Sequence, residues 1–292
     1  MKFNYTLHSI KIKSEWFDDK DRAKNVYQKI TFEGLYLYIK LYKFRLHNQE
    51  NEHTFITSIS LLRKETGYTS SKVLELLKLM KRAKIINIEN VSRWDYLLDQ
   101  DGNIKDKDIL IITAIDAISS FEKKDDEYYI YINLDLFKKY EESNMYGRIE
   151  KYIALYCLIA KWSNNTEHKM NMRIAKMAKI LGFDKDFVHK MIYEMNRNYF
   201  MSSHRKNRKG GGYYFEHRLL TSTKKEDVEK FLSSEKENVE KLIKRIEKKK
   251  NKKKAIDIEE ELESSEVEFV EEMSNIKHGF GKKNNWGEDD LF

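Results

Sequence analysis

The sequence predicts an α+β fold, mainly helical with small β-hairpins, in which one unit occurs twice. The segment 67–86 resembles the segment 182–201 at an offset of 115 residues. Around both segments, apolar residues at helical spacing give way to apolar–polar alternation. With 40% hydrophobic and 13% aromatic residues, a chain of 292 residues has room for about two domains with real cores.

The repeat keeps residue type at matched positions. The pairs are Gly67 with Gly182, Tyr68 with Phe183, Val73 with Val188, Leu76 with Met191, Leu77 with Ile192, Met80 with Met195 and Arg82 with Arg197. Because a glycine–aromatic pair stands at the same place in both copies, we interpret the repeat as a duplicated domain.

Each copy predicts the same order of elements. A first amphipathic helix covers 32–46 or 148–162, and a short second helix covers 58–67 or 171–182. Gly67 and Gly182 are expected to end these second helices in the left-handed conformation. A third helix then begins at Thr69 or Ser70 in one copy and at Asp184 in the other, and a β-hairpin follows.

This order resembles the winged-helix family of DNA-binding domains, twice over, across roughly residues 30–220. The tandem arrangement looks like replication initiators and primosomal helicase-loading proteins of Gram-positive plasmids and phages. The resemblance implies two tandem winged-helix domains, at 1–120 and 121–222, followed by a charged helix at 223–262 and a disordered acidic tail at 263–292. It further implies a third helix in the major groove and a hairpin "wing" against the minor groove or backbone.

The expected function is therefore sequence-specific binding of double-stranded DNA in replication initiation or primosome assembly of a plasmid or phage. A winged-helix transcriptional regulator and a protein–protein adaptor without DNA binding are the alternatives. The charge distribution favours a polyanionic partner. Residues 255–292 carry twelve acids against three lysines, which gives a net charge of −9. Because the whole chain has a net charge of +7, the first 254 residues carry a net charge of +16.

The second copy supplies most of the candidate DNA-binding residues. Its third helix is expected to expose donors suited to base edges and phosphates, namely Lys185, His189, Lys190, Asn196 and Arg197. The tip of its wing carries Arg205, Lys206, Arg208 and Lys209. Three glycines at 210–212 would let this cationic hairpin lie close to phosphates.

The first copy is expected to bind DNA less strongly, or to serve partly in dimerisation, so a homodimer is one alternative. Its candidate residues are Ser70, Ser71, Lys72, Lys78 and Arg82. Its wing, DQDGNIKDKD at 99–108, is acidic at the turn, where Asp101–Gly102 forms a tight hairpin. The glycine of this loop falls at the fourth place instead of the sixth, so the loop is not a calcium site.

After the repeat, apolar residues at 228, 232, 239, 242 and 246 predict a helix, interrupted by Glu235. This is either a short coiled coil or one helix packed on the preceding domain, and we favour the second. The last residues resemble the acidic C-terminal tip of bacterial single-stranded-DNA-binding proteins, without that family's proline before phenylalanine. The resemblance implies capture of a replisome protein through Trp286, Asp289, Asp290, Leu291 and Phe292.

Other function classes find no support. We find no nucleophile elbow, zinc-protease motif or phosphate-binding loop, so no enzyme, cofactor or metal is predicted. The single cysteine, Cys157, lies in an apolar run, is expected to be buried, and suits a reducing cytoplasm. Neither an apolar signal segment nor a run of 18 apolar residues occurs, so we expect a cytoplasmic protein without a membrane span.

Overall fold

The structure is a computed structural model, and it describes residues 9–18, 25–46, 53–117, 129–143, 145, 148–163, 170–207, 213–249 and 251. The fold is α+β, as predicted. The chain divides into two compact units, 1–240 and 241–292. Among the described residues, none of the helices combines the length and the apolar character needed to cross a membrane.

The first copy of the repeat combines helices with a three-stranded antiparallel sheet. Its strands are ordered β2-β4-β3, so the first strand pairs with the last. The elements, in chain order, are α1 (Val26–Leu41), the 3-10 turn η2 (Tyr42–Phe44), β2 (Thr54–Thr57), α2 (Ile59–Thr66), α3 (Ser70–Arg82), β3 (Ile86–Ile88), the 3-10 turn η3 (Trp94–Leu97) and β4 (Leu110–Ala114).

The second copy repeats this order. A single antiparallel bridge between Met170 and His217 stands where β2 stands in the first copy. The elements are α5 (Ile149–Trp162), α6 (Ile174–Leu181), α7 (Lys185–Arg197), β6 (Met201–Asn207) and β7 (Tyr213–Leu219). The helices α6 and α7 follow α2 and α3 at an offset of 115, residue for residue, as the sequence repeat predicts.

The local signals behind these helices act as expected. Gly67 and Gly182 both adopt left-handed backbone angles, with φ of 73° and 69°, and end α2 and α6. Thr69 caps α3 by accepting the backbone N–H of Lys72, and Asp184 caps α7. The cap of α3 is therefore Thr69, which settles the alternative of Ser70.

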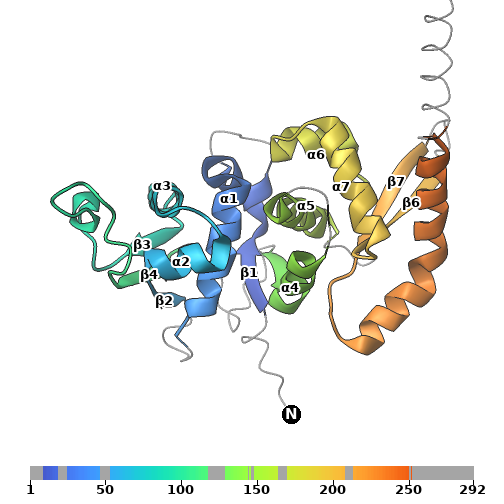
Figure 1. Cartoon of the computed structure of the whole chain (residues 1–292). Coiled ribbons are helices and arrows are strands. Elements are labelled where there is room, and N and C mark those ends of the chain that lie inside the picture. The colour runs from blue at the N-terminus through green and yellow to red at the C-terminus, as the bar shows by residue number, and fades with distance from the viewer. Residues whose placement is uncertain are drawn as a thin grey trace, which may run out of the picture. The chain divides into compact units, whose positions relative to one another are not determined.

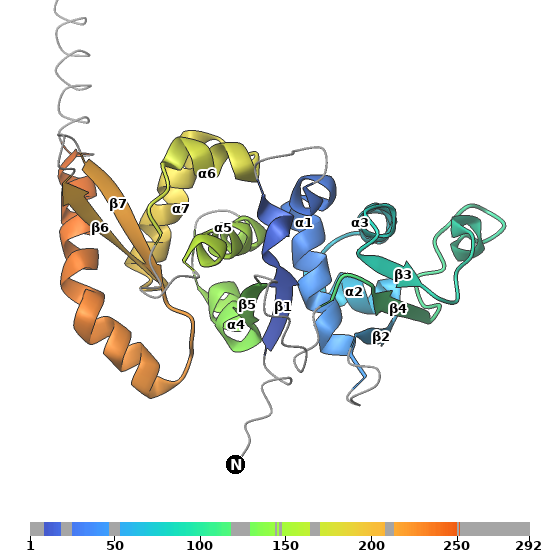
Figure 2. The same cartoon turned by 180° about the vertical axis from the view of Figure 1, so that it is seen from behind.

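Three elements that the sequence analysis did not predict connect the two copies. The strand β1 (Ser9–Lys13) pairs antiparallel with β5 (Tyr129–Asn133), and α4 (Leu134–Glu142) follows β5 directly. The N-terminal strand thus joins a strand that lies beyond the predicted boundary at 120. Figures 1 and 2 show α1 and α5 between the two sets of elements, with β2–β4–β3, α2 and α3 on one side and α6, α7, β6 and β7 on the other.

The core is rich in large aromatic side chains. Trp16, in the short 3-10 turn η1 (Ser14–Phe17), meets Tyr38 edge to face at 5.0 Å between ring centroids. Tyr140 and Phe200 stack at 4.0 Å. Such rings bury large apolar areas, and their hydroxyls need partners, as where Tyr27 donates to the carbonyl of Leu181 at 3.2 Å. The core therefore runs through α1, α5 and the start of α6–α7 without a break between the copies.

The predicted helix after the repeat covers 225–249, and its residues up to 240 pack on the β6–β7 hairpin. Phe231 and Val239 are buried there. Glu235, which interrupts the apolar pattern, accepts from Ser202 at 2.5 Å and from Arg218 at 2.8 Å. In this part of the chain the helix packs on the preceding hairpin, and the interrupting carboxylate faces the sheet and is hydrogen-bonded.

Candidate nucleic-acid interface

The helix α7 presents a charged outer face because its inner face is used for packing. Val188, Met191 and Met195 are fully buried, at the spacing of one helical stripe. The prediction of solvent exposure is confirmed for four of the five candidates on this helix, which are Lys185, His189, Lys190 and Arg197. These side chains are donors of the kind that contact phosphates and base edges.

The prediction that Asn196 is exposed is wrong. Asn196 is fully buried, and its side-chain amide donates to the carbonyl of Ile192 at 2.7 Å and to the hydroxyl of Ser203 at 2.9 Å. The Ser203 hydroxyl is in turn 2.8 Å from Nδ1 of His217, which is also buried. Asn196 therefore links α7 to the β6–β7 hairpin and is not placed to contact bases.

The segment predicted to be the second wing is the β6–β7 hairpin, paired in register from Met201–Leu219 to Asn207–Tyr213. Its base is buried at Ser202 and Ser203, whereas Arg205 is exposed and Lys206 is half-buried toward the tip. The hairpin prediction is confirmed. Two of the four predicted wing cations, Arg208 and Lys209, lie outside the described residues.

The helix 225–240 supports this wing from behind. Burial opposes the charged form of Glu235, but hydrogen bonds from Ser202, Arg218 and Asn238 outweigh it and lower the pKa of this carboxyl. Asn238 also lies 2.7 Å from Nδ1 of His204. The helix thus holds the hairpin at Ser202, His204 and Arg218, next to the strand segment that carries Arg205 and Lys206.

A row of cations on α6 was missed by the sequence analysis. Arg173, Lys176 and Lys179 are exposed at intervals of three residues, so they share one face of the helix. They line a cavity of about 450 Å³ together with Asn25 and Gln28 of the α1 end. The spacing in NMRIAKMAKIL was the available signal.

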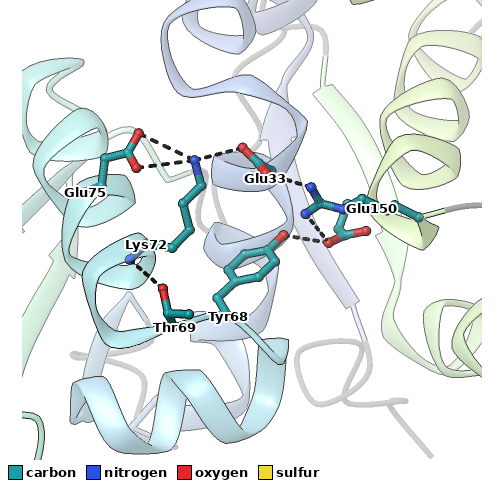
Figure 3. A network of polar contacts seen from close by, with 7 residues as sticks. Glu33, Tyr68, Thr69, Lys72, Glu75 and Glu150 are labelled. Carbon is teal, nitrogen blue, oxygen red and sulfur yellow. Dashed lines mark hydrogen bonds and ion pairs between the residues drawn. The ribbon is translucent and has the colours of Figure 1, made fainter.

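One candidate cation of the first copy, Lys72, is paired with acids. Lys72 forms ion pairs with Glu33 at 3.1 Å and with Glu75 at 3.3 Å, as Figure 3 shows. Partial burial alone would lower the pKa of Lys72, but the two carboxylates reverse this and raise it. Lys72 is therefore not the freely presented cation that we predicted, because Glu33 reaches it from another helix.

The remaining first-copy candidates differ in exposure. Ser71 and Arg82 are exposed, Ser70 is half-buried, and Lys78 is exposed with its ammonium 5.7 Å from the ring centroid of Trp94. At the tip of the first wing, the Asp99 carboxylate accepts the backbone N–H groups of Asp101 and Asn103. These bonds lower the pKa of Asp99. The predicted acidic turn is confirmed, and its carboxylate stabilises the turn.

The same first-copy helix is tied to the second copy. Tyr68 donates to Glu150 at 2.8 Å, and Arg148 bridges Glu150 and Glu33 at 2.8 and 2.9 Å. The labelled members of this network in Figure 3 come from α1, from α3 and the turn before it, and from the start of α5. The network therefore restrains α3, the third helix of the first copy, relative to α5.

The remaining predictions concern the cysteine, the C-terminal residues and metal binding. Cys157 is buried, as predicted, and burial raises the pKa of its thiol. The proposed tip residues Trp286, Asp289, Asp290, Leu291 and Phe292 lie outside the described residues. In the described part of the chain, no group of three or more His, Cys, Asp or Glu side chains could hold a metal ion.

In comparisons with known proteins, no family model, no curated protein and no experimentally determined structure matches this chain.

Proposed function

We propose that this chain is a tandem winged-helix protein that binds double-stranded DNA in a sequence-specific manner through its second copy. The carrying observation is that α7 exposes Lys185, His189, Lys190 and Arg197 directly before a hairpin that carries Arg205 and Lys206. A helix edge and an adjacent cationic hairpin can engage a groove and its flanking phosphates together.

The topology supports this proposal. A winged-helix domain is expected to run helix, strand, helix, helix, strand, strand, with the first strand beside the last. The first copy has this order, with β2 beside β4, and the second copy has the Met170–His217 bridge in the same place.

The copies would then have different tasks. The ion pairs of Lys72 and the acidic turn at Asp99 reduce the attraction of the first copy for phosphate. We propose that the first copy contributes less to DNA affinity and positions the second copy through the Tyr68–Glu150 contact. A role in plasmid or phage replication initiation or primosome assembly completes the proposal, and it rests on the sequence resemblance.

The direct test is the salt dependence of duplex binding. If about six phosphates are neutralised, the logarithm of affinity should fall with the logarithm of salt concentration with a slope of roughly −5. A random-sequence duplex measured in parallel separates specific from non-specific binding. A slope near zero, or no binding at low salt, would favour the adaptor alternative instead.

A further inference from the structure

A second surface, on β1 and β5, combines exposed aromatic rings with cations. On β5, Tyr129 and Tyr131 are 39% and 36% exposed, which is unusual for rings in a chain with so many buried tyrosines. Their register partners on β1 are Lys13 and Lys11, and the Lys11 ammonium lies 4.7 Å from the ring centroid of Tyr129. Flat rings beside cations can stack a base and hold its phosphate.

The two tyrosines form one wall of a cavity of about 550 Å³. This volume falls within the range of sites for small organic ligands. Across the cavity lie side chains from the C-terminal half of α5, from the end of β7 and from the helix 225–240. Asp227 and Lys230 of that helix provide an exposed carboxylate and an exposed ammonium group at the same cavity.

Two hydroxyl groups at this cavity have unused hydrogen-bonding capacity within the described part of the chain. The hydroxyls of Tyr156, which is 1% exposed, and Ser163, which is 7% exposed, are buried without a hydrogen-bond partner among the described residues. Leaving a buried hydroxyl unpaired costs free energy, so these two groups would gain from a hydrogen bond to a ligand. Burial raises the pKa of Tyr156, so its hydroxyl keeps its proton and can donate at neutral pH.

From these contacts, we infer that the cavity binds an unpaired nucleobase, stacked on Tyr131 and hydrogen-bonded along its edge by Tyr156 and Ser163. A planar ring with donors and acceptors on its edge fits an aromatic wall opposite unpaired hydroxyls. Asp227 can accept from a base amino group, and Lys230 can hold the attached phosphate. Paired bases present no free face to stack, so this site is distinct from duplex binding and goes beyond the function proposed above.

The test uses the full chain and a single-stranded DNA 12-mer that carries one 2-aminopurine. Binding is followed by quenching of the 2-aminopurine, and the same strand in duplex form is the competitor. Tyr131→Leu should weaken single-strand binding at least fivefold because the stacking ring is removed. Tyr96→Leu is the matched control, because Tyr96 is an exposed tyrosine on the first wing, and it should leave binding unchanged.

The hydroxyls allow a sharper variant. Because the Tyr156 hydroxyl has no partner among the described residues, Tyr156→Phe should keep or raise thermal stability while lowering single-strand affinity roughly three- to tenfold. Ser163→Ala should act in the same way. A purely structural role would instead change stability and leave affinity unchanged.

Competition identifies the source of the base and can overturn the inference. If nucleoside monophosphates displace the 12-mer, the site takes free nucleotides. If only unlabelled strands displace it, the site takes single-stranded DNA. Both results support a base pocket. Equal displacement by N-acetyltyrosinamide, or Tyr131→Leu binding like the wild type, would overturn it. The salt slope with duplex DNA is measured separately, so failure here leaves the duplex proposal standing.

Discussion

The side-chain amide of Asn196 in α7 donates a hydrogen bond of 2.9 Å to the hydroxyl of Ser203 in β6. Both residues are buried, and His217 of β7 lies next in the chain of contacts, 2.8 Å from the same hydroxyl. One polar chain therefore links α7 with both strands of its wing. The relative position of the two proposed DNA-binding elements depends on it.

We expect Asn196→Ala to lower the free energy of unfolding by about 1–3 kcal/mol, because it leaves buried groups without their partner. Urea titration followed by circular dichroism measures this. Arg197→Ala is the neighbouring control, and as an exposed substitution it should change stability by less than about 0.5 kcal/mol. A stable Asn196→Ala protein with altered base preference would contradict the structural role and restore the base-reading hypothesis.

Arg197 and Arg82 occupy equivalent places in the two copies, so they test the division of labour. Both are exposed at the ends of α7 and α3. We expect Arg197→Ala to weaken duplex binding by about 1–3 kcal/mol if this arginine contacts a base, and to relax the preference at one position of the site. Arg82→Ala should cost less, because the first copy carries more paired charge and an acidic turn.

Fluorescence anisotropy with specific and random duplexes measures both variants at one salt concentration. Equal decreases in affinity for the two variants would show that both copies engage DNA alike.

The helices of the repeat could be predicted from the sequence because their signals are local. The left-handed Gly67 and Gly182, the caps Thr69 and Asp184, and the apolar stripe on each third helix all act within a few residues of where they stand. These signals define the start and end of each helix without reference to the rest of the chain.

The missed features depend on partners far away in the sequence. The pairing of β1 with β5 joins residues about 120 positions apart, and the local sequence of either strand does not identify its partner. Asn196 is polar and was assigned to the outer face, but a hydroxyl on the following strand makes its burial favourable. The charge of Lys72 is neutralised by Glu33, which lies on a different helix.

The second wing should contribute affinity without specificity. Replacing Arg205, Lys206, Arg208 and Lys209 together by alanine should weaken binding to every duplex. The salt slope should become less negative, by about one unit for each phosphate that the wing no longer neutralises. The matched control is Arg93→Ala in the first wing, where Arg93 is already paired with Asp95 at 2.7 Å. Full affinity in the quadruple variant would refute the role of the wing.

The acidic C-terminal residues are predicted to recruit a partner and not to bind DNA. Deleting Asp289–Phe292 should leave folding and duplex affinity unchanged, or raise affinity slightly because an internal competitor for the cationic surface is removed. The same deletion should abolish replication in cells. Normal replication with the truncated chain would reduce this segment to a charged appendage.

The buried His217 makes the second copy sensitive to acid. Burial lowers the pKa of His217 to about 4, whereas a histidine in the unfolded chain titrates near 6.5. Between these values the unfolded chain binds more protons than the native one, so the free energy of unfolding falls as pH falls. The contribution of His217 to the free energy of unfolding is complete above about pH 6.5. It is lost toward pH 4, by an amount on the order of 3 kcal/mol.

Urea unfolding at pH 7, 6, 5 and 4.5 measures this dependence. His217→Gln removes the titrating ring, so it should start from lower stability at pH 7 but show a flatter dependence between pH 6.5 and 4.5. His189→Gln is the control, because His189 lies exposed on α7 and its replacement should leave the steep acid dependence in place. If His217→Gln loses stability as steeply as the wild type over this interval, the acid sensitivity arises from carboxylates such as Glu235. The lowered pKa of Glu235 makes its own contribution disappear at more acidic pH, as it becomes protonated.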